Sequence, residues 1–475
     1  MSTKEIREGM SVEELSAALP PPWREPGARG KIRERVLAAG ALIVVADDDP
    51  TGTQTVHDVP VLFRWSARTL RPAFSMGEPL VFISTNSRSL DAGAAARTAR
   101  ALGRNVARAA QGAARPVTMI SRSDSTLRGH YPREVEELAR GLGAAPDLTV
   151  LVPAFFEGGR CTAGDVHWVI QGGRLVPAGK TEFAQDPVFG FRSSNLKLWV
   201  EEKTGGRIRA DSVLSVSLDT IRTGGPTGVA RVLQDARHGA TVVVNACADE
   251  DLEVFVLGML DAEERGRRFL CRTAASFVKV RAGMEDRPLL SAGEIGSDGG
   301  PVLFIVGSYV QKTSRQLAAL LAAPGVEGVE FHADAARTRG SLARECAAAA
   351  RQVSACLARG QSAVLSTSRD VKVDADFLRF GASLMQGLCS VVGRLETRPS
   401  AMVAKGGITS IQVARAGLHA DGARVAGQVL AGVPVWRLGE GCLYPGLPYV
   451  VFPGNVGGDA ALADLLSVLR PRAGA

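Results

Sequence analysis

The chain has 475 residues, of which 45% are hydrophobic and 22% are charged. This composition is ordinary for a globular protein and excludes a largely disordered chain. Domains usually span ~100 to 200 residues, so the length predicts two or three of them. No apolar run reaches the ~18 residues of a membrane span, and the charged N-terminus lacks the apolar segment of a secretory signal. We therefore expect a cytoplasmic protein with no membrane partner.

The formal net charge of +7 comes from 56 basic and 49 acidic residues that are spread along the whole chain. There is no basic run, and aromatic residues make up 5%, so the sequence does not indicate a nucleic-acid partner. The seven cysteines form no C-x-x-C pair, and no histidine stands at zinc-finger spacing. A structural zinc site is therefore not expected.

Short apolar strands alternate with helical segments in the first half of the chain. The strands are expected at 41–46, 80–84, 116–121, 148–154 and 241–246, and the helices at 91–111, 132–141 and 249–263. This alternation predicts a mainly parallel sheet with helices on both faces, as in a Rossmann-like α/β domain.

The stretch 281–301 is rich in Gly, Pro and Asp and is the best candidate for a linker. The alternation then restarts, with strands expected at 302–308, 362–367 and 401–407 and helices at 311–322, 341–359, 374–393 and 459–469. We predict two α/β domains, an N-terminal one over 1–290 and a C-terminal one over 300–475.

The residues that follow the strands differ between the two halves. In open α/β sheets, ligands bind beyond the carboxyl ends of the strands. In the first half these segments are ADDDPTGTQ, STNSRS, SRSDSTLRG and PAFFEGGR, and in the second half they are GSYVQKTS, AKGGITS and PGNVGG. We therefore expect two half-sites, one rich in carboxylates and guanidinium groups and the other in backbone N–H groups.

Three adjacent acids, Asp47, Asp48 and Asp49, follow the first strand. Carboxylates in this position favour a Mg²⁺ site or a general base, and the alternative is a solvated turn. The same residues, with Thr51, fit the DxDxT nucleophile motif of haloacid-dehalogenase-type phosphatases. That interpretation also requires a later acidic pair, for which the sequence offers no convincing example.

The segment SRSDSTLRGH (121–130) gathers Arg122, Asp124 and Arg128 within seven residues. Arginine side chains bind carboxylates through two parallel hydrogen bonds, so this loop is a candidate pocket for a carboxylate and its hydroxyl groups. Arg88 is a further candidate for holding an anion. The alternative is a surface loop with an internal ion pair.

Three glycine- and hydroxyl-rich loops follow strands in the second half. In AKGGITS, Gly406 and Gly407 allow a close approach of the backbone, and Thr409 stands where a helix could begin. The loops at 307–314 and 453–458 have the same character. Together the three loops indicate a nucleotide phosphate site.

Taken in order, these loops resemble the signatures of the four-carbon acid sugar kinase family, once known only as a domain of unknown function. ADDDPTGTQ resembles ADD-x-TG, SRSDSTLRG resembles K-x-DSTLRG, and PAFFEGGRCTAGD resembles PAFPENGRTT-x-G. GSYVQKTSRQ, AKGGITS and VVFPGNVGG resemble GS-x-S-x-x-T-x-x-Q, GGETS and PGNFG. The resemblance extends from about residue 41 to about residue 470.

The resemblance implies an N-terminal domain that binds a sugar acid and a distinct C-terminal nucleotide-binding domain. The activity would be ATP-dependent phosphorylation of a four-carbon acid such as threonate or erythronate, with ATP and Mg²⁺ as cofactors and a homodimer as a further option. The substrate would be bound by Asp47, Arg88, Arg122, Ser123, Ser125 and Arg128. ATP would be bound by Ser308, Gly406, Gly407, Thr409, Gly454 and Asn455.

The mechanism that we expect makes Asp48 or Asp124 the acceptor of the proton from the attacking hydroxyl group, in a site that closes around its substrates. No residue is assigned as a metal ligand. Ile408 stands where the family has Glu, Arg122 where many members have Lys, and His130 where many have Asn. Two alternatives stay open, a DxDxT-type sugar-phosphate phosphatase and a non-catalytic sugar-acid sensor gated by ATP.

Overall fold

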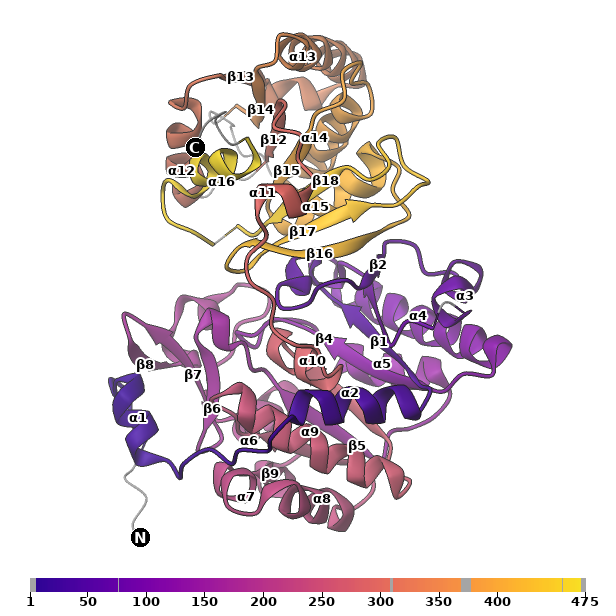
Figure 1. The fold of residues 1–475 in the computed structure, drawn as a ribbon, viewed down its shortest axis with the longest axis vertical. Coiled ribbons are helices and arrows are strands. Elements are labelled where there is room, and N and C mark those ends of the chain that lie inside the picture. The colour runs from indigo at the N-terminus through magenta and orange to yellow at the C-terminus, as the bar shows by residue number, and fades with distance from the viewer. Residues whose placement is uncertain (1–5, 76, 308–310, 369–376, 455, 471–475) are drawn as a thin grey trace. The chain divides into compact units, whose positions relative to one another are not determined.

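The structure is a computed structural model that describes residues 6–75, 77–307, 311–368, 377–454 and 456–470. The chain forms two compact units. Unit 1 comprises residues up to Gly52 and Trp65–Asp286, and unit 2 comprises Thr53–Arg64 and the chain from Arg287 onwards. In Figure 1 the chain of unit 1 runs from indigo to salmon, and unit 2 carries the orange and yellow elements.

Unit 1 is built on a sheet of seven parallel strands in the order β3-β1-β4-β11-β5-β10-β9. The strands are β1 (Leu42–Asp47), β3 (Leu80–Ser84), β4 (Val117–Arg122), β5 (Leu148–Val152), β9 (Leu214–Val216), β10 (Ala240–Val244) and β11 (Phe269–Thr273). Every residue of β1, β3, β10 and β11 is buried, as expected for parallel strands that helices cover on both faces.

The helices of unit 1 precede, connect and follow these strands. They are α1 (Val12–Ala18), α2 (Ala28–Ala38), α3 (Ala67–Ser75), α4 (Ala92–Ala113), α5 (Arg133–Leu142), α6 (Leu196–Lys203), α7 (Leu218–Arg222), α8 (Gly225–Asp235), α9 (Asp249–Glu264) and α10 (Ala275–Arg281). Helix α4 begins after Asp91, whose side chain accepts a hydrogen bond from the backbone of Ala94 and so caps the helix.

Helices α4 and α5 pack against each other where both carry glycine. A Cβ atom on Gly103 would lie 2.5 Å from the carbonyl oxygen of Leu138, and one on Gly141 would lie 2.3 Å from that of Arg100. The two backbones therefore touch at this crossing. Because α4 follows the loop after β3 and α5 follows the loop after β4, this contact fixes two strand-end loops relative to each other.

A small antiparallel sheet stands apart from the main one. It consists of β6 (Arg160–Ala163), β7 (Val166–Gln171) and β8 (Arg174–Pro177). Its apolar side chains form a separate core with α1, in which Leu15 packs with Trp168 and Leu175. The sequence analysis did not anticipate these three strands.

Unit 2 has five parallel strands followed by three antiparallel ones, in the order β13-β14-β12-β15-β18-β17-β16-β2. They are β2 (Pro60–Leu62), β12 (Val302–Val306), β13 (Val326–Phe331), β14 (Ser362–Thr367), β15 (Ala401–Lys405), β16 (Gly422–Leu430), β17 (Val433–Leu438) and β18 (Pro448–Phe452). The helices are α11 (Ala292–Ile295), α12 (Gln311–Leu321), α13 (Arg339–Ala358), α14 (Phe377–Val392), α15 (Gly407–Gln412) and α16 (Ala461–Leu469). The core of this unit is aliphatic, with Phe304 and Phe452 among its larger members.

The segment Thr53–Arg64 belongs to unit 2 although unit 1 flanks it on both sides. Strand β2 pairs with β16, and the Trp436 indole Nε1 donates to Thr53 Oγ1 at 3.0 Å. The amide of Gln54 donates to the carbonyl of Gly432 at 3.0 Å. Since the partners are almost 400 residues away in the sequence, local patterns gave no indication of this pairing.

The expected fold class, two α/β domains with mainly parallel sheets, is confirmed. The strand at 80–84 and the helix at 249–263 agree with β3 and α9 to within one residue at each end. The hairpin β16–β17 was missed because its pairing is antiparallel and lies within a region expected to alternate between strands and helices. The expected linker at 281–301 includes the last residue of α10 and the short helix α11.

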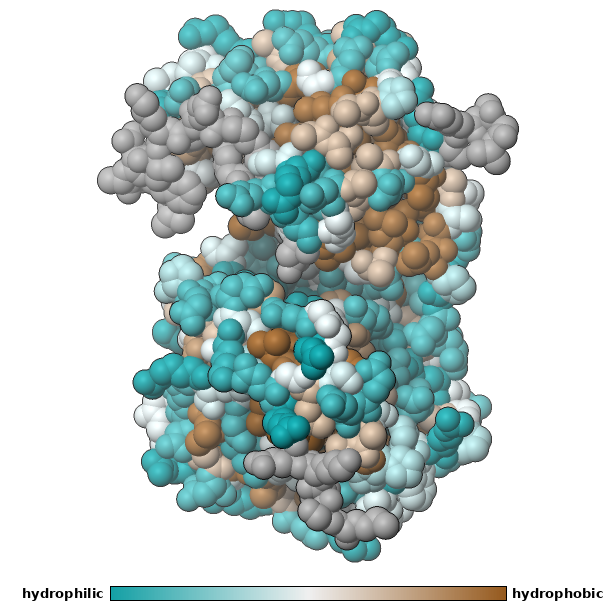
Figure 2. All heavy atoms as spheres, turned by 90° about the vertical axis from the view of Figure 1, so that its left-hand side faces the viewer, coloured by the Kyte–Doolittle hydropathy of each residue, from teal (hydrophilic) through white to brown (hydrophobic). Residues whose placement is uncertain are grey.

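No helix among the described residues is long and apolar enough to cross a membrane. Figure 2 shows one face of the molecule, on which hydrophilic side chains are mixed with smaller groups of apolar ones.

The α4–α5 crossing predicts a difference between two glycines of the same helix. Gly103→Ala should lower the free energy of unfolding by about 1–3 kcal/mol, because the added methyl group overlaps the backbone of α5. Gly112→Ala is the matched control: nothing lies within 4 Å of its Cβ position, so helix propensity should raise stability by up to ~1 kcal/mol. Urea unfolding followed by circular dichroism measures both, and equal effects would show that the backbones do not touch here.

Candidate functional site

Acidic and basic side chains meet at the carboxyl edge of the unit 1 sheet. Asp47 ends β1 and Arg122 ends β4, and the two residues are partners in the parallel register. Their side chains form an ion pair with 3.3 Å between Asp47 Oδ1 and Arg122 Nη1. The next strand contributes Thr85, whose backbone N–H and hydroxyl both donate to the carbonyl of Asp47 at 2.9 Å.

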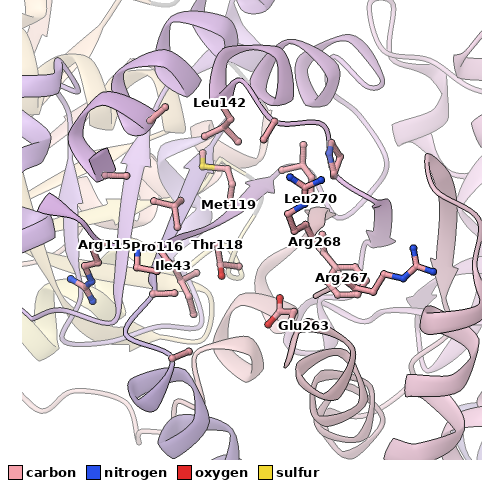
Figure 3. A pocket seen from close by; sticks show the side chains of 18 of the residues that line it. Ile43, Arg115, Pro116, Thr118, Met119, Leu142, Glu263, Arg267, Arg268 and Leu270 are labelled. Atoms are coloured by element: carbon pink, nitrogen blue, oxygen red, sulfur yellow. The ribbon is translucent and has the colours of Figure 1, made fainter. Parts of the chain in front are cut away.

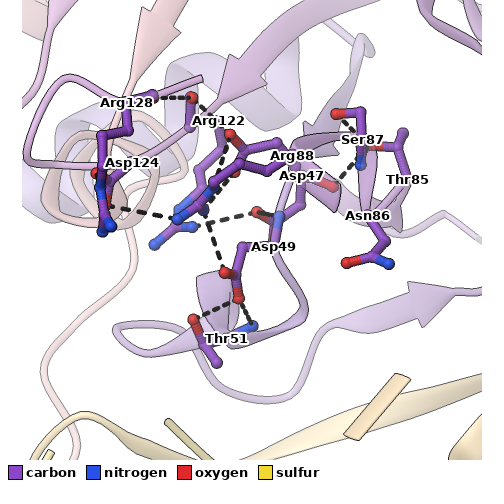
Figure 4. A network of polar contacts seen from close by, with 12 residues as sticks. Asp47, Asp49, Thr51, Thr85, Asn86, Ser87, Arg88, Arg122, Asp124 and Arg128 are labelled. Carbon is purple, nitrogen blue, oxygen red and sulfur yellow. Dashed lines mark hydrogen bonds and ion pairs between the residues drawn. The ribbon is translucent and has the colours of Figure 1, made fainter. Parts of the chain in front are cut away.

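Arg88 is the centre of this network (Figure 4). It lies in a single 3-10 turn, Ser87–Ser89, which follows the left-handed residue Asn86. Its guanidinium group contacts three carboxylates, at 2.7 Å from Asp48 Oδ1, 3.3 Å from Asp49 Oδ2 and 3.6 Å from Asp124 Oδ1. One cation therefore holds together acids that would otherwise repel one another.

The carboxylates differ in pKa. Burial opposes the ionisation of Asp49 and Asp124, but Arg88 and the neighbouring donors together outweigh it in both cases and lower each pKa. Hydrogen bonds from Thr51 assist at Asp49, and Arg128 assists at Asp124. The opposite holds for Asp47: burial raises its pKa to about 7 against the attraction of Arg122, and the neighbouring acids add to the rise.

Gly52 packs directly on the carboxylate of Asp47. A Cβ atom at this position would lie 2.0 Å from Asp47 Oδ2. Any larger residue would displace the carboxylate of Asp47, so Gly52 is required here for steric reasons. Asp47 itself is 2% exposed, which leaves its carboxylate out of reach of a substrate.

The loop after β4 curls back on itself to hold Asp124. Arg128 Nε donates to Asp124 Oδ2 at 2.7 Å, and the hydroxyl of Thr126 donates to the same oxygen. The turn needs a left-handed residue at Leu127 (φ 71°) and a glycine at Gly129 (φ 122°). A Cβ atom on Gly129 would lie 2.6 Å from Ser123 Oγ.

Two serines of this loop support the network in different ways. Ser123 Oγ donates to Asp48 Oδ2 at 2.6 Å. The carbonyl of Ser125 lies 2.7 Å from His167 Nε2. Burial lowers the pKa of His167 to about 4, so its imidazole is neutral at physiological pH and donates to that carbonyl.

Exposure divides the network into two layers. The side chains of Asp124, Arg88 and Arg128 are 12%, 17% and 25% exposed, whereas those of Asp48 and Arg122 are 2% and 5% exposed. The first layer can touch a bound molecule, and the second supports it from below. Figure 4 shows Arg88 directed toward both Asp124 and Asp49.

Arg272 was missed by the sequence analysis and is the main support of the Asp124 loop. Its Nη2 donates to Ser123 Oγ at 3.2 Å and to the carbonyl of Arg128 at 3.0 Å, and its Nη1 donates to the carbonyl of Asp124 at 3.4 Å. It is 1% exposed and lies over the ring of Trp199. A guanidinium within the apolar run FLCRT of β11 was the signal that could have identified it.

Glu134 was also missed. This buried carboxylate, in the first turn of α5, accepts a hydrogen bond from Ser87 Oγ at 2.5 Å. Burial and the nearby charge of Asp48 raise its pKa to about 7. Through Ser87 it fixes the turn that carries Arg88.

In unit 2 the strand β15 leads into the expected glycine turn. Gly406 has φ 107° and donates its N–H to the carbonyl of Phe452 at 2.8 Å, and Gly407 begins α15. A Cβ atom on Gly307, at the end of β12, would lie 3.1 Å from Thr409 Oγ1. The turns after β12 and β15 therefore meet around the hydroxyl of Thr409.

The third loop follows β18. The carbonyl of Gly454 accepts a hydrogen bond from Lys405 Nζ at 3.1 Å, and a Cβ on Gly454 would meet no atom within 4 Å. Two of the expected ATP-binding residues, Ser308 and Asn455, lie outside the described residues.

The described residues do not form a protein cage for Mg²⁺. No group of three or more His, Cys, Asp or Glu side chains in that part of the chain is arranged to hold a metal ion. Asp47, Asp48, Asp49 and Asp124 each pair with a guanidinium group instead. In unit 2 the residue that stands where the resembling signature has Glu is the apolar Ile408, which is 52% exposed.

A cavity of about 670 Å³ lies elsewhere in unit 1 (Figure 3). Pro116, Arg268 and Ala41, which line it, precede β4, β11 and β1, so it lies at the amino edge of the sheet and away from the acids. Arg115 in its wall donates to the carbonyls of Gly40, Phe74 and Glu78. Arg115 therefore fastens chain segments, and the cavity lies at the opposite edge of the sheet from the acids that follow β1 and β4.

Comparison with protein families supports the division into two units. Residues 43–281 match the model of a sugar-binding N-terminal domain, and residues 303–462 match the model of a nucleotide-binding C-terminal domain. Together the two models cover most of the chain.

Single relatives agree with these matches. A D-threonate kinase of Cupriavidus necator is 29% identical over 372 residues, which are 74% of this chain and 79% of the relative. A Salmonella typhimurium LT2 protein, provisionally called a tRNA synthase, superposes with a TM-score of 0.65 at 17% identity, covering 89% of this chain and 98% of its own. A Haemophilus influenzae protein from a family of unknown function superposes with a TM-score of 0.59 at 16% identity, covering 90% of this chain and 100% of its own.

The two structures establish the fold alone, whereas the domain models and the six ordered motifs identify the family. The chain belongs to the four-carbon acid sugar kinase family and is a phosphotransferase of the sugar-acid kinase type, with an alcohol group as acceptor.

Proposed function

We propose that this protein transfers the γ-phosphoryl group of ATP to a hydroxyl group of a four-carbon sugar acid of the threonate or erythronate type. The observation that carries the proposal is the layer of guanidinium groups and acids at the carboxyl edge of the unit 1 sheet. The name of the relative from Cupriavidus necator points to the same substrate class.

In this proposal the N-terminal domain (1–290) binds the sugar acid. Arg88 and Arg128 are the cations of the exposed layer, and each keeps donors that can reach a substrate carboxylate. Arg122 and Asp47 support that layer from the end of the sheet, and Ser123 and Ser125 hold the loop between them.

The C-terminal domain (300–475) binds ATP. Gly406 and Gly407 let the backbone approach the phosphates, and Thr409 and Gly454 border the same region. Ser308 and Asn455 complete the site in this proposal. Mg²⁺ would come bound to the ATP phosphates, and no step is assigned to it.

The two candidate bases differ in their surroundings. Both oxygens of Asp48 are occupied, one by Arg88 and the other by Ser123. Asp124 belongs to the exposed layer, so we assign it the contact with the attacking hydroxyl and give Asp48 a positioning role. A low pKa suits Asp124, because a loose phosphoryl-transfer transition state needs the hydroxyl oriented more than it needs a strong base.

A DxDxT phosphatase would need Asp47 as an exposed nucleophile. Asp47 is buried between Arg122 and Gly52, and Asp49 Oδ1 accepts from the N–H and the hydroxyl of Thr51. The acidic loop is therefore internally bonded. A non-catalytic sensor would have the same pockets but would release no product.

The first test is a coupled ADP-release assay with D- and L-threonate and D- and L-erythronate. We expect ADP release that depends on one of these acids, with inorganic phosphate release from sugar phosphates at background level. Binding of ATP and acid without ADP release would favour the sensor. Absence of acid-dependent ADP release from all four acids would refute the proposed substrate class.

The second test compares the roles of Asp124 and Asp186, two carboxylates that both contact Arg128. Asp124→Asn should lower kcat by about 10²–10⁴-fold, because the hydroxyl loses its charged acceptor. The affinity for ATP should not change. The control is Asp186→Asn, whose carboxylate lies 3.6 Å from Arg128 Nη1 and should affect kcat less than tenfold. Equal losses would mean that both acids act only by fixing Arg128.

The third test uses the raised pKa of Asp47. Its folded pKa of about 7 lies above the usual 3.8, so its contribution to stability is full below about pH 4 and is lost as the pH rises through 7, at about 1.4 kcal/mol per pKa unit. In urea unfolding experiments, the free energy of unfolding of the wild type should therefore fall between pH 4 and pH 8. That of Asp47→Asn should not show this fall.

Asp49 provides a control of opposite sign. Its pKa is lowered in the folded protein, so its carboxylate adds stability above about pH 4 and loses it as the pH falls. Asp49→Asn should therefore be least stable, relative to the wild type, at neutral pH. The same pH response in both variants would contradict the opposite pKa shifts of Asp47 and Asp49.

A further inference from the structure

Lys405, the last residue of β15, is a fully buried lysine between two of the glycine loops. Its side chain is 0% exposed, and its Nζ donates to the carbonyls of Pro453 at 2.8 Å and Gly454 at 3.1 Å. Lys405 and Phe452 are partners in the parallel register of β15 and β18. The ammonium group thus ties the loop after β18 to the strand end from which the Gly406–Gly407 turn leaves.

The charge of Lys405 has no acidic partner among the described residues. Its other neighbour is the ring of Phe452, with 4.4 Å between Nζ and the ring centroid. Burial, together with the smaller effect of the charge of Lys312 on α12, lowers the pKa of Lys405 to about 7. A buried cation that meets only carbonyls and a ring pays a desolvation cost that a nearby anion would offset.

We propose that Lys405 is a positioning residue of the nucleotide site, which holds the Pro453–Gly454 loop in place and whose charge is balanced by the phosphates of bound ATP. This inference rests on the proposed ATP-dependent function and extends it to Lys405, a residue of the AKGGITS segment to which the sequence analysis gave no role. Lys405 does not touch the nucleotide, because no part of its side chain is exposed. It acts through the two carbonyls that it holds and through its charge.

The region around Lys405 favours a polyanion over other ligands. Lys312 brings a second positive charge from α12, and it is the charged group that acts on Lys405 within the described part of the chain. Ile408, the exposed side chain of the adjacent turn, adds no negative charge. The negative charges of a nucleotide's phosphates would be attracted to these two lysines, whereas a cation would be repelled.

The proposal predicts that ATP binding is accompanied by proton uptake. Without nucleotide Lys405 loses its proton near neutral pH, and the phosphates stabilise the charged form and raise its pKa. Between the two pKa values, at about pH 8, binding therefore takes up part of a proton, and the affinity for ATP falls as the pH rises. Titration calorimetry with MgATP at pH 8, in phosphate and in Tris buffers, measures this uptake on the wild-type protein.

The variant Lys405→Met removes both the charge and the two hydrogen bonds, and it keeps an unbranched side chain of similar length. We expect the KM for ATP to rise about tenfold or more, because each lost bond involves a charged donor. The KM for the sugar acid should stay within about twofold, and the proton uptake should disappear. Lys405→Arg, which keeps the charge, should regain part of the affinity for ATP.

The matched control is Lys180→Met in unit 1, where the same substitution removes a lysine that is exposed and paired with Glu8. It should leave both KM values and the proton uptake unchanged. Unchanged ATP affinity in folded Lys405→Met, or wild-type binding without proton uptake at pH 8, would overturn the role of Lys405. Failure of the wild type to bind ATP in any buffer would instead overturn the proposed function on which this inference rests.

Discussion

The contact of Arg88 with three carboxylates is the interaction on which the candidate site depends. Asp48, Asp49 and Asp124 come from two loops, and their mutual repulsion would drive the loops apart without a shared cation. Arg88 is itself fixed by the turn that Glu134 holds through Ser87. The strand ends, the two loops and the first turn of α5 are thus connected through one set of ion pairs and hydrogen bonds.

A second layer of buried groups holds this arrangement in place from below. Arg272 crosses beneath the Asp124 loop and satisfies two of its carbonyls, while the glycine contact between α4 and α5 fixes the helices that follow the two loops. Preorganisation of this kind suits phosphoryl transfer, in which positioning and charge stabilisation supply most of the rate enhancement. Unit 2 is arranged differently: glycine turns follow its strands, and the buried Lys405 holds two carbonyls of the loop after β18.

Much of this could be predicted from the sequence because parallel α/β architecture has a local signature. Buried strands such as β3 appear as continuous apolar runs, and the polar segments after them mark the sheet edge where ligands bind. The exposed residues Arg88, Asp124 and Arg128 were therefore found together with their loops.

The supporting residues could not be found in this way. Arg272 and Lys405 lie at or near the ends of apolar strands, where a single charge looks like an interruption until its partners are known. Those partners are backbone carbonyls of distant loops. Every residue has such a carbonyl, so the pattern of side chains does not show which ones are bound. The pairing of β2 with β16 was missed for a related reason, since the two strands come from distant segments of the chain and share no local pattern.

The assignment of Thr53–Arg64 to unit 2 has a consequence for how the protein can be divided. The chain crosses between the units at Gly52, at Arg64 and at Asp286, so one cut in the linker does not separate two complete folding units. A fragment that begins at Arg287 would lack β2, leave one edge of β16 unpaired and deprive the indole of Trp436 of its acceptor. An unpaired strand edge can pair with another chain, so a fragment that begins at Arg287 should be prone to self-association.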